Sequence, residues 1–390
     1  MGPAWIISAV AAGPATMASV AMTGSLYGYQ MLWVVVLSAL LAFVVQYMAA
    51  KAGIIGQRGI ISTVESVWGS TLAWILTVDA VAATWLAAAV LLKALVDTTV
   101  LITSLPGSWW PFVYVVLIFF LVGLGGYRAL ELVCKILVGL VVACFMITVI
   151  KVGPDPAALI KGLVPRLPGG SEGALMTAGI MGGAVHITII GMHTYNVNAR
   201  RWGKEKMGLA GVDTFLSMFV AFGLYSVAIY VAGAAVLHPD GIRIKSALDL
   251  AATLTPALGP YAGAVLLAGL YGAVLSTITP TYLAAGYFLA DKLGWDLTVQ
   301  DNRFRALVGV GLAVSLLGPL YKGGFLTMLV VMLALGLCGT PLIILLLLLL
   351  LNKKSWAGEY LNGWLLNVMG GLALVITTFL AVRFLWSKFL

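Results

Sequence analysis

Three polar side chains lie inside one long apolar stretch of this sequence, residues 176–201. His186, Thr188 and His193 follow a Gly182-Gly183 pair that interrupts the middle of the stretch. Imidazole and hydroxyl groups are costly among lipid tails, so they usually face the protein interior or a water-filled pathway. Unwound backbone within a span also leaves carbonyls and amides free to hold a solute. The stretch therefore predicts a broken transmembrane helix that lines a solute site.

A second apolar stretch, residues 9–20, carries Gly13-Pro14 at its centre. Helix breakers in the middle of a span are typical of the discontinuous helices that line transporter sites. The two breaks lie about 170 residues apart, which fits corresponding helices of two structural repeats. We therefore expect one site near the membrane midplane, built from both breaks by Ala12, Gly13, Thr16, Gly183, His186 and Thr188.

The composition is that of a membrane protein. Hydrophobic residues make up 62% of the chain and charged residues 9%, with a mean hydropathy of +1.08, whereas soluble chains are roughly a quarter charged. The net charge of +8 is scattered over many loops and does not indicate nucleic acid binding. Three cysteines within apolar runs predict neither disulfides nor a zinc site. We expect no cofactor and no enzyme, because no loop carries a nucleophile and base pair, a nucleotide loop or a metal cluster.

Apolar runs of sufficient length predict eleven transmembrane helices. They are expected at residues 3–24, 28–50, 70–103, 110–126, 130–152, 174–199, 208–237, 259–290, 305–320, 325–351 and 362–386. The first run has no basic segment before it and no cleavage site after it, so we expect a retained helix rather than a signal peptide.

Lys and Arg are distributed unevenly between the two sets of loops that these spans define. The loops on the side of the N-terminus hold most of them, whereas the short loops at residues 24–28 and 104–111 hold none. Positively charged loops usually stay in the cytoplasm. We therefore expect an integral protein of a bacterial-type plasma membrane, with a cytoplasmic N-terminus and an outside C-terminus.

Six segments spread over nearly the whole chain form a recognisable set. In chain order they are GPAWIISAVAAGP, GSLYGYQMLWVVVLSALLAFVVQYMAAKAGI, GYRALELVCK, MHTYNVNAR, STITPTYLAAGYF and TPLIILLLLLLLN. Together they resemble the NRAMP (natural resistance-associated macrophage protein) family of divalent-metal transporters. The resemblance implies a LeuT-type fold with broken first and sixth helices. Two inverted five-helix repeats are then expected at residues 1–152 and 153–351, followed by an eleventh helix and tail at 352–390.

The functional residues of the family carry over only in part. Where the family has Asp-Pro-Gly-Asn, this chain has Gly13-Pro14-Ala15-Thr16, so the metal-binding carboxylate is absent. The Met-Pro-His of the sixth helix becomes His186-Ile187-Thr188, while the next family histidine matches His193. In the third helix, two acid positions that the family uses in proton movement hold Trp85 and Ala88.

The usual transition-metal site is therefore not expected. Hard cations are held by several oxygens that normally include carboxylates, and burying a bare divalent charge against neutral ligands is unfavourable. The acids that fall within spans lie near helix ends or away from the breaks; they are Asp79, Asp97, Glu131 and Asp213.

Three further residues are expected along the transport pathway or at a gate: His193, Trp85 and Asp79. Structural roles compete with functional ones throughout. A histidine or tryptophan in a span can simply pack against its neighbours. The threonines beside the breaks can bond to their own helices, and Gly13-Pro14 can be a simple kink.

Three functions remain open at this point. The first is a secondary transporter that moves a cation, for instance magnesium, by alternating access with weak or no proton coupling. The second is a carrier of a small organic or anionic solute, held by half-helix N-termini at Thr16 and Thr188 with His186 as a donor. The third is a membrane protein that kept the fold and lost the site. We favour the cation by analogy with the family, and expect a small solute or ion and the lipid bilayer as partners; the oligomeric state is not predicted.

Overall fold

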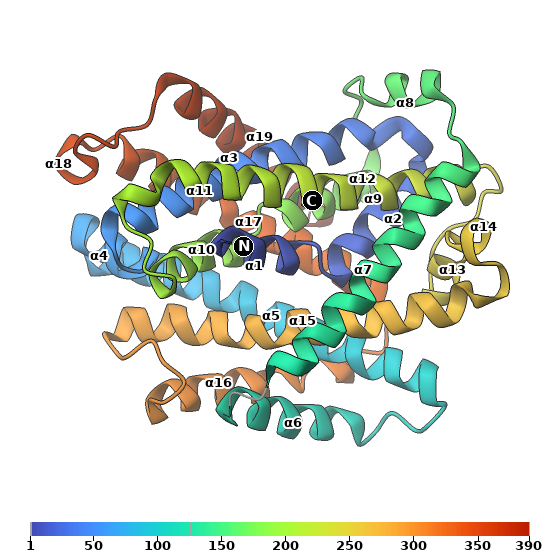
Figure 1. Cartoon of the computed structure of the whole chain (residues 1–390), viewed down its shortest axis with the longest axis horizontal. Coiled ribbons are helices and arrows are strands. Elements are labelled where there is room, and N and C mark those ends of the chain that lie inside the picture. The colour runs from blue at the N-terminus through green and yellow to red at the C-terminus, as the bar shows by residue number, and fades with distance from the viewer. Residues whose placement is uncertain (1, 125–126, 390) are drawn as a thin grey trace.

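The computed structural model describes residues 2–124 and 127–389, and long helices make up most of it (Figure 1). In this part of the chain, nine helical runs are long and apolar enough to cross a membrane, and a shorter apolar helix covers Trp110–Leu121. One of the nine, Pro14–Gly56, turns at Gly28 (φ 55°) and provides two spans. With Pro14–Gly56 counted as two spans and Trp110–Leu121 as one, the described residues hold the eleven expected spans. The chain is an all-α, multi-pass membrane protein, as predicted.

The helices of the first half follow the predicted spans closely. They are α1 (Pro3–Ala11), α2 (Pro14–Tyr27), η1 (Gly28–Met31), α3 (Leu32–Gly56), α4 (Ile60–Trp68), α5 (Ser70–Thr103), α6 (Trp110–Leu124) and α7 (Tyr127–Val152). A short helix, α8 (Pro156–Gly162), connects them to the second half. The side chains of residues 122–131, which include Glu131, lie outside the described residues.

The second half repeats the pattern of one broken helix followed by four spans. Its helices are α9 (Gly170–Ala184), α10 (Ile187–Ala199), η2 (Lys204–Lys206), α11 (Met207–Thr214), the π-helix η3 (Phe215–Ala221), α12 (Phe222–Val236), α13 (Ala247–Ala252), α14 (Thr255–Leu258), η4 (Gly259–Tyr261), α15 (Ala262–Leu293), α16 (Asn302–Ser315), η5 (Gly318–Leu320) and α17 (Phe325–Leu351). After α18 (Lys354–Ala357), α19 (Trp364–Phe389) forms the eleventh span.

The break in the first span lies where the sequence predicts it. Helix α1 ends at Ala11, and α2 begins at Pro14 with Gly13 as its N-cap. Proline suits the first turn of a helix because it has no N–H to satisfy there. Two separate helices therefore replace one continuous span.

The break in the sixth span lies three residues beyond its predicted place. Gly182 and Gly183 belong to the last turn of α9, and the helix is interrupted at Val185 and His186. The glycines serve close packing instead: a Cβ at Gly182 would lie 2.0 Å from the carbonyl oxygen of Leu333 on α17, and one at Gly183 would lie 2.6 Å from Thr16 Oγ1. The prediction that this pair forms the break was wrong.

The two broken helices lie at the centre of the bundle. In α2, all residues from Pro14 to Ser25 are buried, and in α9 all residues from Gly173 to Ala184. Helix α2 packs against α12, α9 against α17, and α5 against α15. Figure 1 shows α1, α10 and α17 in the middle of the bundle, with α3 and α5 on either side. A helix that is apolar all round is expected to be buried in this way.

Candidate functional site: a cavity between two helix breaks

A cavity of about 50 Å³ lies where the two breaks meet. A water molecule occupies about 30 Å³ of liquid, so the cavity has room for one or two particles of that size. Its lining comes from both breaks and from α5, α15 and α17. Five of the six predicted site residues line it: Gly13, Thr16, Gly183, His186 and Thr188. Ala12, the sixth, forms the break itself as the C-cap of α1.

Three backbone carbonyls at the first break are already hydrogen-bonded. The carbonyl of Val10 accepts from the amide of Gly13 at 3.2 Å, and the carbonyl of Ala11 accepts from Thr16 Oγ1 at 2.6 Å. The hydroxyl of Tyr225 donates to the carbonyl of Gly13 at 3.4 Å. These bonds hold the unwound segment in one conformation.

The second break is held by its own histidine and by α17. His186 is the N-cap of α10, and its Nδ1 accepts a hydrogen bond from the amide of Thr188 at 3.2 Å. The carbonyl of Val185 accepts from Thr340 Oγ1 at 2.6 Å. The ring packs on Gly336, where a Cβ would lie 1.7 Å from His186 Nε2. Only glycine at residue 336 leaves room for the imidazole.

Four threonines line the cavity, and the hydroxyl of each directs its proton to another group. Thr16 Oγ1 donates to Ala11, as above, and Thr277 and Thr281 donate to the carbonyls of Ala273 and Thr277, each at 2.8 Å. Thr188 Oγ1 lies 2.9 Å from Thr84 Oγ1, whose own proton goes to the carbonyl of Ala80 at 2.6 Å. Thr188 is therefore the donor in that pair. All four oxygens keep lone pairs that can bind a cation or a donor.

No carboxylate is among the residues that line this cavity. Among the described residues, no group of three or more His, Cys, Asp or Glu side chains could hold a metal. Asp79 packs on α17, where a Cβ at Gly339 would lie 2.1 Å from its Oδ2. Asp213 accepts from the amides of Gly2 and Ala4 at 2.9 and 3.0 Å and so caps α1.

The predicted pathway residues lie away from the cavity. His193 Nδ1 is 2.9 Å from Gln46 Oε1 on α3, and both side chains are buried. The Trp85 indole lies between α5 and α16, where a Cβ at Gly311 would be 3.1 Å from its Nε1. Together with Asp79, these residues flank the site rather than form it, and their role in transport stays a prediction.

A polar network links α4, α10 and α15 beyond the cavity, near the end of α10. The hydroxyl of Tyr195 donates to Asp291 Oδ2 on α15 at 2.8 Å, and the amide of Ser62 on α4 donates to the same oxygen at 3.1 Å. Lys292 forms an ion pair with Glu65 at 2.8 Å. The hydrogen bond from Lys292 lowers the pKa of the Glu65 carboxyl. Helix α4 is thereby tied to the broken helix and to α15.

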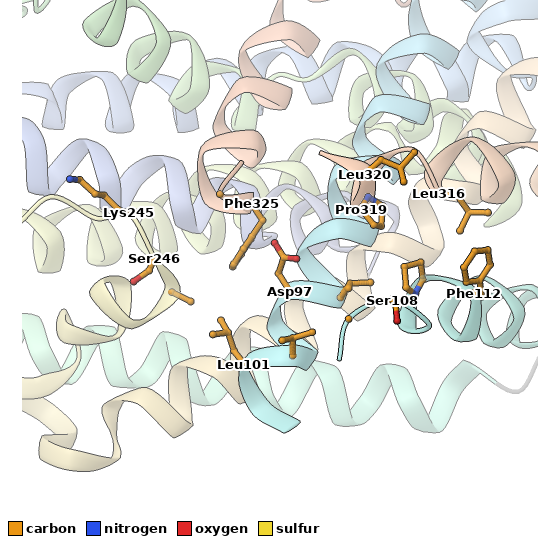
Figure 2. A pocket seen from close by; sticks show the side chains of 16 residues that line it. Asp97, Leu101, Ser108, Phe112, Lys245, Ser246, Leu316, Pro319, Leu320 and Phe325 are labelled. Atoms are coloured by element: carbon orange, nitrogen blue, oxygen red, sulfur yellow. The ribbon is translucent and has the colours of Figure 1, made fainter. Parts of the chain in front are cut away.

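A second, larger cavity of about 770 Å³ lies at the C-terminal end of α5 and the N-terminal end of α17, and we call it the outer cavity. It follows α5 from Val96 to Leu101, whereas the central cavity follows the same helix from Ala87 to Leu91. Figure 2 shows Asp97 between the apolar side chains of this outer cavity. Asp97 forms an ion pair with Lys93 at 2.9 Å.

An all-helical bundle with two broken helices that meet at a small central cavity defines a secondary transporter of the LeuT type. The family model "natural resistance-associated macrophage protein-like" (Nramp) matches residues 4–387, and the chain belongs to this family. It is a membrane transporter and not an enzyme, as predicted.

Two curated relatives share the name divalent metal cation transporter MntH. The protein from Deinococcus radiodurans is 29% identical over 334 residues, which cover 81% of this chain and 74% of the relative. The protein from Erwinia tasmaniensis is 28% identical over 352 residues, which cover 81% and 84%. Both alignments thus extend over most of the two chains.

Solved structures show the same fold. A mutant of the Eremococcus coleocola manganese transporter has a TM-score of 0.75 at 19% identity, covering 98% of this chain and 85% of that one. Mhp1, a nucleobase-cation-symport-1 family transporter, has a TM-score of 0.64 at 16% identity, covering 99% and 92%. The predicted LeuT-type fold is confirmed.

The sequence analysis missed several residues of the site. Thr277 and Thr281 of α15 line the cavity, and Thr84 and Thr340 hold the second break. One signal was available for the first two, because STITPT places four hydroxyls within six residues of an apolar span. Met332 on α17 also lines the cavity and places a thioether there.

Proposed function

We propose that this transporter moves a small cation, such as magnesium, through the central cavity by alternating access and without tight proton coupling. The observation that carries the proposal is the set of four threonine hydroxyls whose protons are committed to other groups. Oxygen lone pairs of this kind are ligands for hard cations. The curated relatives, which are divalent metal cation transporters by name, support a cation as cargo.

The cavity differs from a site for a bare transition metal. Its lining has one thioether, at Met332, and one imidazole, at His186, and it has no carboxylate. The imidazole accepts a backbone hydrogen bond through Nδ1 and therefore carries its proton on Nε2. Hard oxygen ligands dominate, which suits hard cations such as magnesium, calcium or manganese better than softer transition metals.

Movement of the two broken helices against the rest of the bundle is the proposed transport step. The network of Tyr195, Asp291 and Ser62 closes one end of the path, and the outer cavity lies toward the other end. We place the closed end in the cytoplasm, together with the N-terminus, in a bacterial-type plasma membrane. Repeat boundaries at residues 152/153 and 351/352 are part of the same proposal.

Weak proton coupling follows from the charge of the site. No titratable carboxylate lines the cavity, and Trp85 and Ala88 stand where the family resemblance places acids. A proton that accompanied each cation would need an acceptor beside the path. Asp79 is half-buried and packs on Gly339, away from the cavity lining.

A small organic or anionic solute is the second candidate cargo. The first turns of α2 and α10 both line the cavity, and helix N-termini favour negative charge. The His186 side chain also lines the cavity. This candidate requires that the four hydroxyl oxygens hold donor groups of the solute.

Uptake into proteoliposomes tests the proposed function. Purified protein is reconstituted with a magnesium-sensitive dye and a pH-sensitive dye inside the vesicles, and magnesium, manganese or calcium is added outside. We expect saturable cation entry without matching acidification. Acidification in step with uptake would contradict weak coupling, and entry of a small anion with no cation entry would favour the second candidate.

A further inference from the structure

The carboxylate of Asp97 lies among apolar side chains of the outer cavity, as Figure 2 shows. Its Oδ2 pairs with Lys93 at 2.9 Å, but the side chain of Lys93 is only 7% exposed, whereas that of Asp97 is 32% exposed. Asp97 lines the cavity, and it makes no other hydrogen bond or ion pair within the described residues. A carboxylate has about four acceptor sites, so most of its hydrogen-bonding capacity is open to an occupant of the cavity.

Asp97 lies near the outer boundary of the hydrocarbon layer. In a transporter of this fold the central cavity is near the membrane midplane, and here it follows α5 as far as Leu91. Asp97 is almost two turns further along the same helix, which is about 9 Å. Half of the hydrocarbon core is about 15 Å thick. The outer cavity is therefore at the depth where acyl chains meet the lipid headgroups.

The outer cavity opens toward the lipid along α6. Phe112 of α6 and Leu320 of η5 line the cavity and are 62% and 72% exposed. Phe112 begins a row of exposed side chains along α6 that continues with Val116 and Phe120. Figure 1 shows α6 at the edge of the bundle. Because exposed apolar side chains on a span face the acyl chains, an occupant can enter this cavity from the membrane.

A basic residue, Lys245, also lines the outer cavity, and its ammonium has no ion-pair partner among the described residues. Figure 2 shows Lys245 and Ser246 on the same side of Asp97. The Ser246 hydroxyl accepts from the amide of Asp249 at 3.2 Å, which leaves its proton free to donate. The Asp249 carboxylate accepts from the amides of Lys245 and Ser246 at 3.0 and 2.8 Å. The cavity thus offers an acid to a cationic group and a base and a hydroxyl to an anionic group.

We propose that the outer cavity binds a membrane phospholipid with a primary ammonium headgroup, its ammonium on Asp97 and its phosphate beside Lys245. A primary ammonium donates up to three hydrogen bonds, and those to a carboxylate are charge-assisted. The volume of about 770 Å³ lies within the range typical of ligand pockets, so a headgroup and the start of its acyl chains fit. The lipid would contact α5 and α17, two helices that also line the central cavity.

Native mass spectrometry of the full-length protein, released from detergent micelles, measures this binding. The protein is titrated separately with phosphatidylethanolamine, phosphatidylcholine and phosphatidylglycerol of the same acyl chains. The choline headgroup differs from ethanolamine by three N-methyl groups and donates no hydrogen bond. We expect one ethanolamine lipid to bind about tenfold more tightly than the choline lipid. Equal affinity for these two lipids, or a preference for phosphatidylglycerol, would overturn the proposal.

Two substitutions separate the two ends of the headgroup. Asp97→Asn removes the negative charge, and we expect the ethanolamine and choline lipids to bind equally. Lys245→Gln removes the phosphate partner, and we expect both lipids to bind more weakly while the preference remains. Asp240→Asn is the control, because Asp240 is exposed in the loop between α12 and α13 and does not line the cavity. A preference for ethanolamine that survives in Asp97→Asn would place the lipid elsewhere and contradict the assignment.

A third substitution keeps the ion pair, since Asp97→Asn leaves the buried ammonium of Lys93 unpaired. Ser108 lines the cavity, and Ser108→Trp places an indole there. We expect binding of the ethanolamine lipid to fall tenfold or more with an unchanged melting temperature. Wild-type binding in Ser108→Trp would contradict a site in this cavity.

Competition with phosphoethanolamine, the headgroup without acyl chains, tests for a water-soluble occupant of the outer cavity. We expect no displacement of the lipid, because the apolar walls contact the chains. Displacement at the same concentration as the lipid would show that the cavity takes a ligand from water and would overturn the lipid site.

Discussion

Thr340 donates a hydrogen bond of 2.6 Å to the carbonyl oxygen of Val185, across the interface between α17 and the second helix break. Interrupting a helix leaves backbone carbonyls without partners, and a buried one costs free energy unless another group donates to it. Thr340 is fully buried and provides that donor. The break is therefore stabilised by a helix more than 150 residues away in the chain.

Replacing Thr340 by Val keeps the shape of the side chain and removes the donor. We expect the free energy of unfolding to fall by about 1–3 kcal/mol, the cost of an unsatisfied buried carbonyl. Thermal unfolding in detergent measures it. Thr377→Val is the matched control, because Thr377 is equally buried but bonds only within α19. Equal losses in the two variants would show that Thr340 has no special role at the break.

Gly336→Ala tests whether the place of the His186 ring matters for transport. The added Cβ would lie 1.7 Å from Nε2, so the imidazole must move and the cavity must change shape. We expect cation uptake to fall by tenfold or more while the protein still folds, measured by proteoliposome flux and by size-exclusion chromatography. Gly371→Ala on α19 meets nothing within 4 Å and should leave uptake unchanged. Full uptake in Gly336→Ala would mean that the position of the His186 ring does not matter for transport.

Tyr195→Phe tests the proposed closed end of the path. Removing the hydroxyl deletes its 2.8 Å bond to Asp291 and loosens α10 from α15. We expect faster hydrogen exchange in α4, which depends on the same carboxylate through Ser62. Tyr287→Phe is the control, since Tyr287 stacks on Tyr195 but makes no such bond in the described structure. The same exchange rates in wild type and Tyr195→Phe would mean that this network does not hold the bundle closed.

The ion pair of Glu65 and Lys292 predicts a pH dependence of stability. Because the hydrogen bond from Lys292 lowers the pKa of Glu65 below its ordinary value of 4.5, the pair stabilises the folded state fully above that value. The contribution is lost as the pH falls from there through the lowered pKa. The difference in melting temperature between wild type and Glu65→Gln should therefore be constant at neutral pH and shrink below about pH 4.5. A difference in melting temperature that grows as the pH falls would contradict this prediction.

The sequence predicted the helices and the first break well, and the second break less well. Hydropathy places spans because each must cross the same apolar layer, and Gly13-Pro14 interrupts a helix by its own chemistry. Gly182-Gly183 misled the prediction because glycine serves both flexibility and close packing. Only the approach of Leu333 and Thr16 shows that packing is its role here.

The threonines of the cavity could not be assigned from the sequence alone. A threonine in a membrane helix commonly bonds to its own backbone, as Thr277 and Thr281 do. Their lone pairs belong to the proposed site only because α15 passes beside the first break, where a Cβ at Gly13 would lie 3.0 Å from Thr277 Oγ1. That pairing depends on tertiary structure, which spacing within one helix does not encode.

Calorimetric titration of magnesium into wild type, Thr277→Val and Thr281→Val tests the central claim most directly, with Thr377→Val as the control. The account predicts saturable binding in the wild type and control, and about tenfold weaker binding in each of the first two variants, because each loses one oxygen ligand. Wild-type affinity in both variants, or no response to any cation, would contradict a cation site built from these hydroxyls.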